Sequence, residues 1–132
     1  MSEDFDIALR SILRQLVEAR EDQSDAEMRL HDYRAAETPP EIPNEFEDVD
    51  AFLDYHHRRQ SYENHLRQHE NVLKAARREY TEAAEQLLVF LPDGVPLRYT
   101  YEGERSELFG AGYAIVRKQG EIVIESHSRT TS

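Results

Sequence analysis

The sequence predicts an α+β fold, in which a long antiparallel two-helix hairpin, coiled-coil-like, is followed by a small three-stranded antiparallel β-meander. Three observations support this prediction. Two long segments carry apolar residues in alternating steps of three and four, and a proline-rich segment separates them. After the second segment, short runs alternate apolar and polar residues between turn signals, as half-buried strands do.

The first helix is expected over residues 3–36. Its apolar seam starts at Phe5 and continues with the 4-3-4-3 spacing of a coiled coil as far as Tyr33. Leu13 and Val17 widen this stripe in the N-terminal half of the helix only. That half lies near the end of the hairpin from which the sheet emerges, so the sheet is expected to use it.

The linker over residues 37–47 contains three prolines, which cannot donate backbone hydrogen bonds and disfavour helical geometry in the residue before them. Asn44 and Glu47 have the spacing of a capping box for the next helix, and Asp48 is an alternative N-cap. The sequence leaves open whether this tip of the hairpin binds something or only connects the helices.

The second helix is expected over residues 48–90, with a seam of the same spacing that starts at Phe52. We predict a register in which paired residue numbers sum to 92, because it sets alanine against leucine in several layers. This register also places the polar Gln23 opposite the polar His69.

The β-meander is expected over residues 96–127. Leu97–Tyr101 alternates apolar and polar residues, and Ile122–Ile124 forms the last strand. The Lys118–Glu121 turn joins the last two strands as a hairpin. Four residues are expected to share one face of the middle strand: Phe109, Ala111, Tyr113 and Ile115.

Length and composition set further bounds. A chain of 132 residues suits one domain, here 1–127, followed by a disordered polar tail over 128–132. It contains no cysteine, which removes disulfides, thiolate catalysis and cysteine-based zinc sites. The sequence shows neither a secretory signal nor a long apolar run, so we expect a cytoplasmic protein without a membrane partner.

The charge is strongly acidic and uneven. The net charge is −11, and residues 1–48 alone carry 14 acids and 5 bases, a net −9. This field repels phosphate backbones, so nucleic acid is not an expected partner. A solvated acidic face is the plain interpretation, although the same field can attract a basic protein.

Candidate chemistry is sparse. His65 and His69 are four residues apart on the second helix and could share a metal, but no third ligand is apparent, and no metal or cofactor is predicted. The His56–His69 segment could still have a role that the sequence does not define. The glycines of the FGAG segment lack the spacing of a phosphate-binding loop, and no nucleophile–base motif is recognisable. The sequence therefore predicts a protein that is not an enzyme.

The leading hypothesis is a non-catalytic protein–protein interaction module, a small adaptor or assembly subunit that acts through its helical hairpin and sheet surface. A thin core leaves apolar residues beyond the seam, which a second copy (as a homodimer) or another protein could cover. The candidate interaction residues are Leu13, Val17, Leu53, Val72, Leu88, Val116 and Val123. Two alternatives remain: an acidic inhibitor or decoy that blocks a basic, nucleic-acid-binding site, and a histidine-based metal-binding helical protein.

Overall fold

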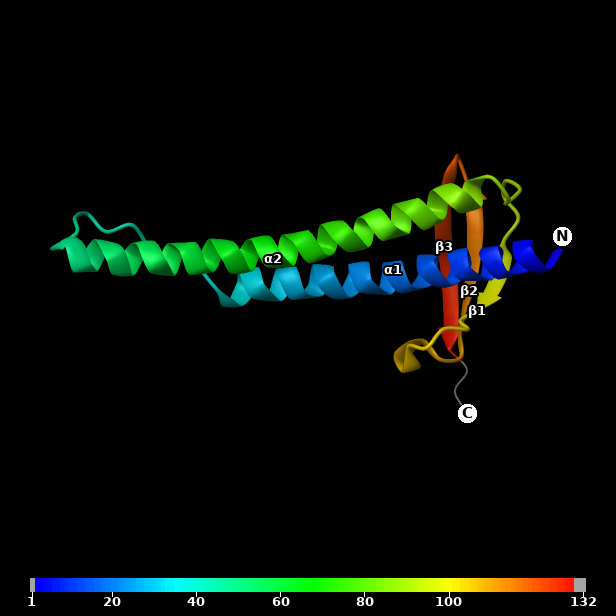
Figure 1. Ribbon diagram of the computed structural model, residues 1–132, viewed down its shortest axis with the longest axis horizontal. Coiled ribbons are helices and arrows are strands. Elements are labelled where there is room, and N and C mark those ends of the chain that lie inside the picture. The colour runs from blue at the N-terminus through cyan, green and yellow to red at the C-terminus, as the bar shows by residue number, and fades with distance from the viewer. Residues whose placement is uncertain (1, 130–132) are drawn as a thin grey trace. The chain divides into compact units, whose positions relative to one another are not determined.

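A computed structural model describes the backbone of residues 2–129 and the side chains of residues 3–125. It confirms the predicted fold: two long helices that pack together as a hairpin, followed by a three-stranded antiparallel sheet (Figure 1). The elements are the helices α1 (Ser2–Ala36) and α2 (Val49–Leu88), the strand β1 (Leu97–Thr100), the 3-10 turn η1 (Ser106–Leu108), and the strands β2 (Ala111–Lys118) and β3 (Glu121–Arg129).

The chain divides into two compact units. The first unit combines residues 1–21 and 77–132, and the second contains residues 22–76. Each helix therefore contributes one part to each unit.

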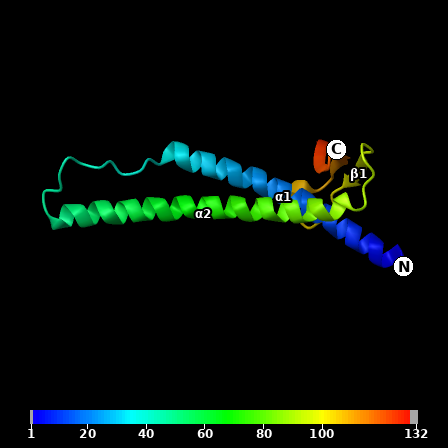
Figure 2. The same ribbon diagram turned by 90° about the horizontal axis from the view of Figure 1, so that it is seen from above.

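The first unit contains the larger core. Leu16 of α1, Leu87 of α2 and Ile115 of β2 are fully buried in one apolar cluster. The strands run across the direction of the helices (Figure 1), and the sheet lies to one side of them (Figure 2). Leu13 and Val17 belong to this core, at 4% and 2% exposure, so the widened half of the first helix does meet the sheet.

The sheet is a simple meander in the order β1-β2-β3, with Tyr99 of β1 opposite Tyr113 of β2. The turn between β2 and β3 confirms the predicted hairpin. Gln119 and Gly120 both have positive φ, 52° and 78°, which is the pattern of a type I′ turn. A bulge between Ala114 and Ile115 shifts the register of β2 against β3.

Two details of the meander differ from the prediction. Phe109 does not share the buried strand face, because it precedes the strand and is 80% exposed. Gly110, at φ 79°, turns the chain after it, and Leu108 of η1 is the fully buried residue instead. The third strand is also longer than expected, since Ser128 pairs with Gly112, and the pairing ends at Arg129. Of the predicted tail, residues 130–132 lie outside the described residues.

The C-terminal end of α2 is held by a side chain from the sheet. The guanidinium Nη1 of Arg117 donates to the carbonyl oxygens of Leu88 at 2.9 Å and Leu91 at 3.5 Å. Carbonyl groups at the end of a helix have no hydrogen-bond partner within the helix, so Arg117 supplies one. A positive charge at this end also interacts favourably with the negative end of the helix dipole. One residue of β2 thus fixes where α2 stops against the sheet.

A second polar contact joins α1 to the segment after β1. The phenol of Tyr101, only 4% exposed, donates a hydrogen bond to the Glu18 carboxylate. The same oxygen accepts the backbone N–H of Arg105 at 3.0 Å. Burial raises the pKa of the Tyr101 phenol, and the bond to Glu18 raises it further.

Burial also raises the pKa values of Tyr80 and Tyr99 in the same unit. A phenol that resists ionisation in the folded state stabilises the fold fully below its unfolded pKa of about 10, and this contribution is lost as pH rises through the folded value. We therefore expect the free energy of unfolding to fall steadily above about pH 10. Chemical denaturation between pH 8 and 11 measures this, and the chain has only two lysines to titrate alongside.

The matched variant for this test is Tyr80→Phe, which keeps the ring and removes one of the shifted phenols. Its slope against pH should be shallower than that of the parent chain. The expectation would be wrong if both proteins kept the same stability from pH 8 to 11. The Tyr80 hydroxyl also donates to the Ile122 carbonyl at 3.1 Å, so the variant should lose some stability at every pH.

Candidate functional site: the tip of the hairpin

The second unit contains the end of the hairpin, where α1 stops before α2 begins. The rings of Tyr33 and Tyr62 stack with their centroids 5.7 Å apart, so the end of α1 lies opposite the middle of α2. The first turns of α2 extend beyond α1, and the loop over residues 37–48 spans that distance (Figure 2). These first turns of α2 therefore have no helix of their own chain opposite them.

The start of α2 is fixed by Asp48. Its carboxylate Oδ1 accepts the backbone N–H of Ala51 at 2.7 Å, which is the contact of an N-cap residue. The alternative cap is thus the one that forms, and the helix starts at Val49. A capped start makes these unpaired turns a regular helical surface.

The predicted helix register was wrong. It placed Gln23 opposite His69, but the His69 ring lies 5.0 Å from the ring of Tyr33. Tyr33 also contacts the His65 ring, at 6.4 Å, so it sits among residues of successive turns of α2 as a knob in a hole. Gln23 instead donates to Glu27 on its own helix, at 3.2 Å. The aromatic contact decided the register, and the predicted polar pair did not form.

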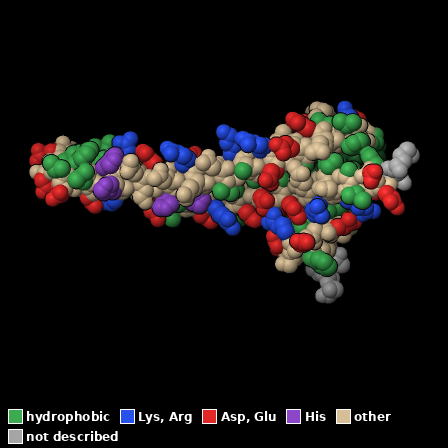
Figure 3. Space-filling view, viewed as in Figure 1, with side chains coloured by type: hydrophobic (Ala, Val, Ile, Leu, Met, Phe, Trp, Pro, Cys, Tyr) green, Lys and Arg blue, Asp and Glu red, His purple; other side chains and the backbone are tan. Residues whose placement is uncertain are grey.

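The tip carries an exposed apolar surface. None of the residues 37–60, all of which the structure describes, is buried. Phe52 is 44% exposed, Leu53 42%, Val49 72% and Ile42 77%. We call these four residues, together with Phe46, the tip surface; Figure 3 shows apolar side chains gathered at this end, with acidic groups beside them.

Phe46 orders the loop against α2. Its ring centroid lies 5.2 Å from that of Phe52, edge to face, and 5.3 Å from that of Tyr55. Such aromatic pairs contribute about 0.5–1.5 kcal/mol beyond the area they bury. The loop is thus attached to the helix by one side chain, while the outer sides of Phe52 and Leu53 remain open to solvent.

A groove of about 570 Å³ lies where α1 ends. The end of α1, the start of the loop and the middle of α2 form its walls. Its lining residues are Tyr33, Glu37, Thr38, Pro39, Pro40, Glu41, Arg58, Ser61, Tyr62 and His65. Burial raises the pKa of the Tyr33 phenol, with a smaller contribution from the nearby charge of Glu37. The groove is of a size that admits side chains of a partner.

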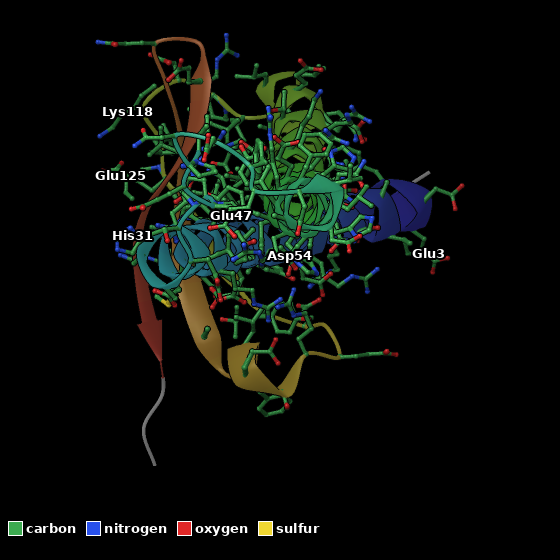
Figure 4. The ribbon with its side chains drawn as sticks, turned by 90° about the vertical axis from the view of Figure 1, so that its left-hand side faces the viewer. Glu3, His31, Glu47, Asp54, Lys118 and Glu125 are labelled. Carbon is green, nitrogen blue, oxygen red and sulfur yellow. The ribbon has the colours of Figure 1, made fainter. Side chains whose placement is uncertain are left out.

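The tip is acidic. Residues 37–55 contain seven acids and no lysine, arginine or histidine, a net charge of −7. Figure 4 faces the N-terminal end of α2 and labels two of these acids, Glu47 from the loop and Asp54 from the helix. Asp54 forms an ion pair with Arg58 at 2.9 Å, so the nearest base is already neutralised. The field around the tip surface is therefore negative.

The structure separates the predicted interaction residues into two groups. Leu13, Val17 and Val116 are buried inside the first unit, with 4%, 2% and 0% exposure, so assigning them to an exposed surface was wrong. Leu13 and Val17 belong to the core cluster that the helices and the sheet form together. Leu88 is partly buried against the same core. Three of the predicted residues remain exposed: Leu53 at 42%, Val72 at 54% and Val123 at 37%.

His65 and His69, the predicted candidate pair, lie on the second helix beside Tyr33. Among the described residues, no three histidine, aspartate or glutamate side chains come together in a way that could hold a metal ion. The rings of His65 and His69 both face Tyr33.

No helix in the described part of the chain has the length and apolar content needed to cross a membrane.

Sequence reasoning assigned Phe52 to the seam and overlooked Ile42, Phe46 and Val49. A usable signal was present. With a register sum of 92, Tyr33 would face Arg59, and every seam residue of α2 before Arg59 would already lack a partner. The unequal lengths of the two predicted helices thus pointed to an unpaired apolar stretch at the tip.

Fold and site together define a class: an α+β protein whose helical hairpin ends in an exposed, acidic, apolar tip. Comparisons with protein-family models, with curated proteins and with solved structures find no match for this chain. Its function therefore has to be argued from the tip itself.

Proposed function

We propose that this chain is a non-catalytic protein–protein interaction module, an adaptor or assembly subunit whose main contact surface is the tip of its hairpin. One observation carries the proposal: four exposed apolar side chains lie in residues 37–60, a stretch of the chain in which no residue is buried. Such residues contribute little to the folded chain that bears them. Contact with another protein accounts for them, since large exposed apolar patches usually mark interaction sites.

The energetics favour binding at this place. Burying one Leu or Phe side chain completely contributes about 1.5–3 kcal/mol, and Phe52 and Leu53 each leave more than two-fifths of their surface in water. They project from a regular helix with an N-cap. A partner would therefore order few backbone torsions when it binds, which reduces the entropic cost of association.

Val72 of α2 and Val123 of β3 remain candidates for secondary contacts, because both are exposed apolar residues outside the tip. Neither belongs to the aromatic cluster of Phe46, Phe52 and Tyr55, so neither carries the proposal by itself. The acidic-decoy alternative keeps one supporting observation, the net −7 of residues 37–55. It differs in requiring the charges alone and not the apolar residues.

Photo-crosslinking tests the proposal. A benzophenone amino acid placed at Leu53 should give a discrete crosslinked product in the source cell, while the same group at Val89 should not. Both positions are exposed, at 42% and 79%, but Val89 belongs to the first unit and lies outside residues 37–60. Adding Phe52→Ser to the Leu53 probe should remove the product. Equal products from both positions, or a product only from Val89, would contradict the assignment of the contact surface.

A further inference from the structure

We infer that the segment that binds the tip surface is a basic amphipathic helix: an apolar stripe flanked by lysine or arginine. This inference rests on the proposed function, because it specifies the partner of the same surface. Two properties of the tip carry it, the direction of the exposed apolar stripe and the sign of the charge around it.

The stripe indicates a helical partner. Val49, Phe52 and Leu53 occupy positions i, i+3 and i+4 of α2, so they form a row along one side of the helix axis. Rows with this spacing are buried most completely by another helix, whose own ridges fit between them. The row begins at the first residue of α2, and the His56 ring continues it, stacked on that of Phe52 with the centroids 6.0 Å apart. A partner helix of three to five turns is enough to cover this row.

The charges indicate a basic partner. Glu45 and Glu47 lie close before the stripe in the chain, Asp50 lies within the same helical turn, and Glu41 lines the groove. None of these four forms an ion pair with any described residue. Lysine or arginine on both sides of a partner's apolar stripe would meet these carboxylates, which raises the association rate and fixes the orientation of the partner.

A second copy of this chain is disfavoured as the occupant. Two tips brought together would place net charges of −5 next to each other, when Arg58 and Arg59 are counted with the seven acids of residues 37–60. Like charges in an interface oppose association and exclude a partner of the same sign.

Fluorescence anisotropy with a defined probe tests the inference. The probe is a fluorescein-labelled peptide of about 18 residues made of leucine and lysine, with the leucines in one helical stripe. The full chain should bind it at about 50 mM salt, and the affinity should fall as salt is raised. Two control peptides should bind at least about tenfold more weakly: one with glutamate in place of lysine, and one with the same composition but no stripe.

Matched variants locate the binding. Phe52→Ser with Leu53→Ser should weaken binding of the peptide at least about tenfold. Val89→Ser with Phe109→Ser changes two residues that are more exposed, at 79% and 80%, but lie outside the tip, and it should change the affinity by less than about twofold. Neutralising the four acids Glu41, Glu45, Glu47 and Asp50 should also weaken it at least about tenfold. Neutralising Asp4, Asp6, Glu82 and Glu85, exposed acids of the first unit, should have much less effect. Circular dichroism should show that all four variants stay folded.

Several results would overturn the inference. Equal binding of the lysine and glutamate peptides would show that the partner does not need to be basic. Equal effects of the two sets of acid variants would show that the acids of the tip are not the ones that bind it. Dependence on the acids without the apolar pair would favour the decoy alternative. Self-association by light scattering, lost in the Phe52→Ser and Leu53→Ser variant, would make a second copy the occupant. A crosslink from Leu53 to a segment that is not a basic helix would also refute the inference, yet leave the proposed contact surface standing.

Discussion

Replacing Leu16 by alanine is expected to lower the free energy of unfolding of the first unit by about 2–5 kcal/mol. Leu16 is fully buried, and its cluster joins α1, α2 and the sheet through residues such as Leu87 and Ile115, which are also fully buried. Truncation removes the transfer free energy of the lost methyl groups and leaves a cavity that three elements together cannot easily fill. Hydrogen exchange of the β2 amides measures the effect where this core lies.

Leu53→Ala is the matched control for Leu16→Ala, because it makes the same chemical change at a residue that is 42% exposed. It should alter stability by no more than about 0.5 kcal/mol and should weaken binding of the basic helical peptide. A large loss of stability from Leu53→Ala would mean that the tip supports the fold and is not a contact surface.

Gly103→Ala is expected to lower the free energy of unfolding by about 1–3 kcal/mol. A β-carbon at this position would overlap the ring end of Tyr101 and would lie 2.8 Å from Oε2 of Glu18. The tyrosine cannot turn away cheaply, since its ring is 4% exposed and its hydroxyl is hydrogen-bonded to Glu18 and to the backbone of Arg105. Relief of the overlap would break this polar contact between α1 and the segment after β1.

A double-mutant cycle separates this overlap from other effects of Gly103→Ala. In a Tyr101→Ala background the new methyl group meets no ring, so the added cost of Gly103→Ala should fall below about 0.5 kcal/mol. Urea denaturation of the four proteins gives the coupling. An equal cost in both backgrounds would assign the effect to the backbone of the turn, and the role given to Tyr101 would be withdrawn.

The buried apolar clusters and the exposed tip surface are made of different residues. The first unit holds the larger apolar cluster, and the second unit holds a small one of Ala26, Leu30 and Leu73, with Leu66 packed against it. Residues 37–60 contribute no residue to either of these clusters, because none of them is buried. Substitutions in the tip should therefore change binding with little change in stability, and substitutions in the core should do the reverse.

The sequence by itself determined the elements of this protein. The seams from Phe5 and from Phe52 predicted both helices within a few residues of their observed ends, because a period of three and four residues is a local property. The chain reverses between the two helices at the prolines after Ala36, and between β2 and β3 at the Gly120 turn. Both reversals could be predicted because these backbone constraints act within a few residues.

Tertiary structure alone decided what each apolar residue contacts. Leu13 and Val116 were both candidate interaction residues in the sequence, but they are 4% and 0% exposed in the folded chain. The register followed the contacts of Tyr33 with Tyr62 and His69, which join residues 29 and 36 positions apart. The tip surface is exposed because, in that register, the first turns of α2 extend beyond the end of α1. Burial depends on contacts distant in the chain, and the local pattern that defines a helix does not contain them.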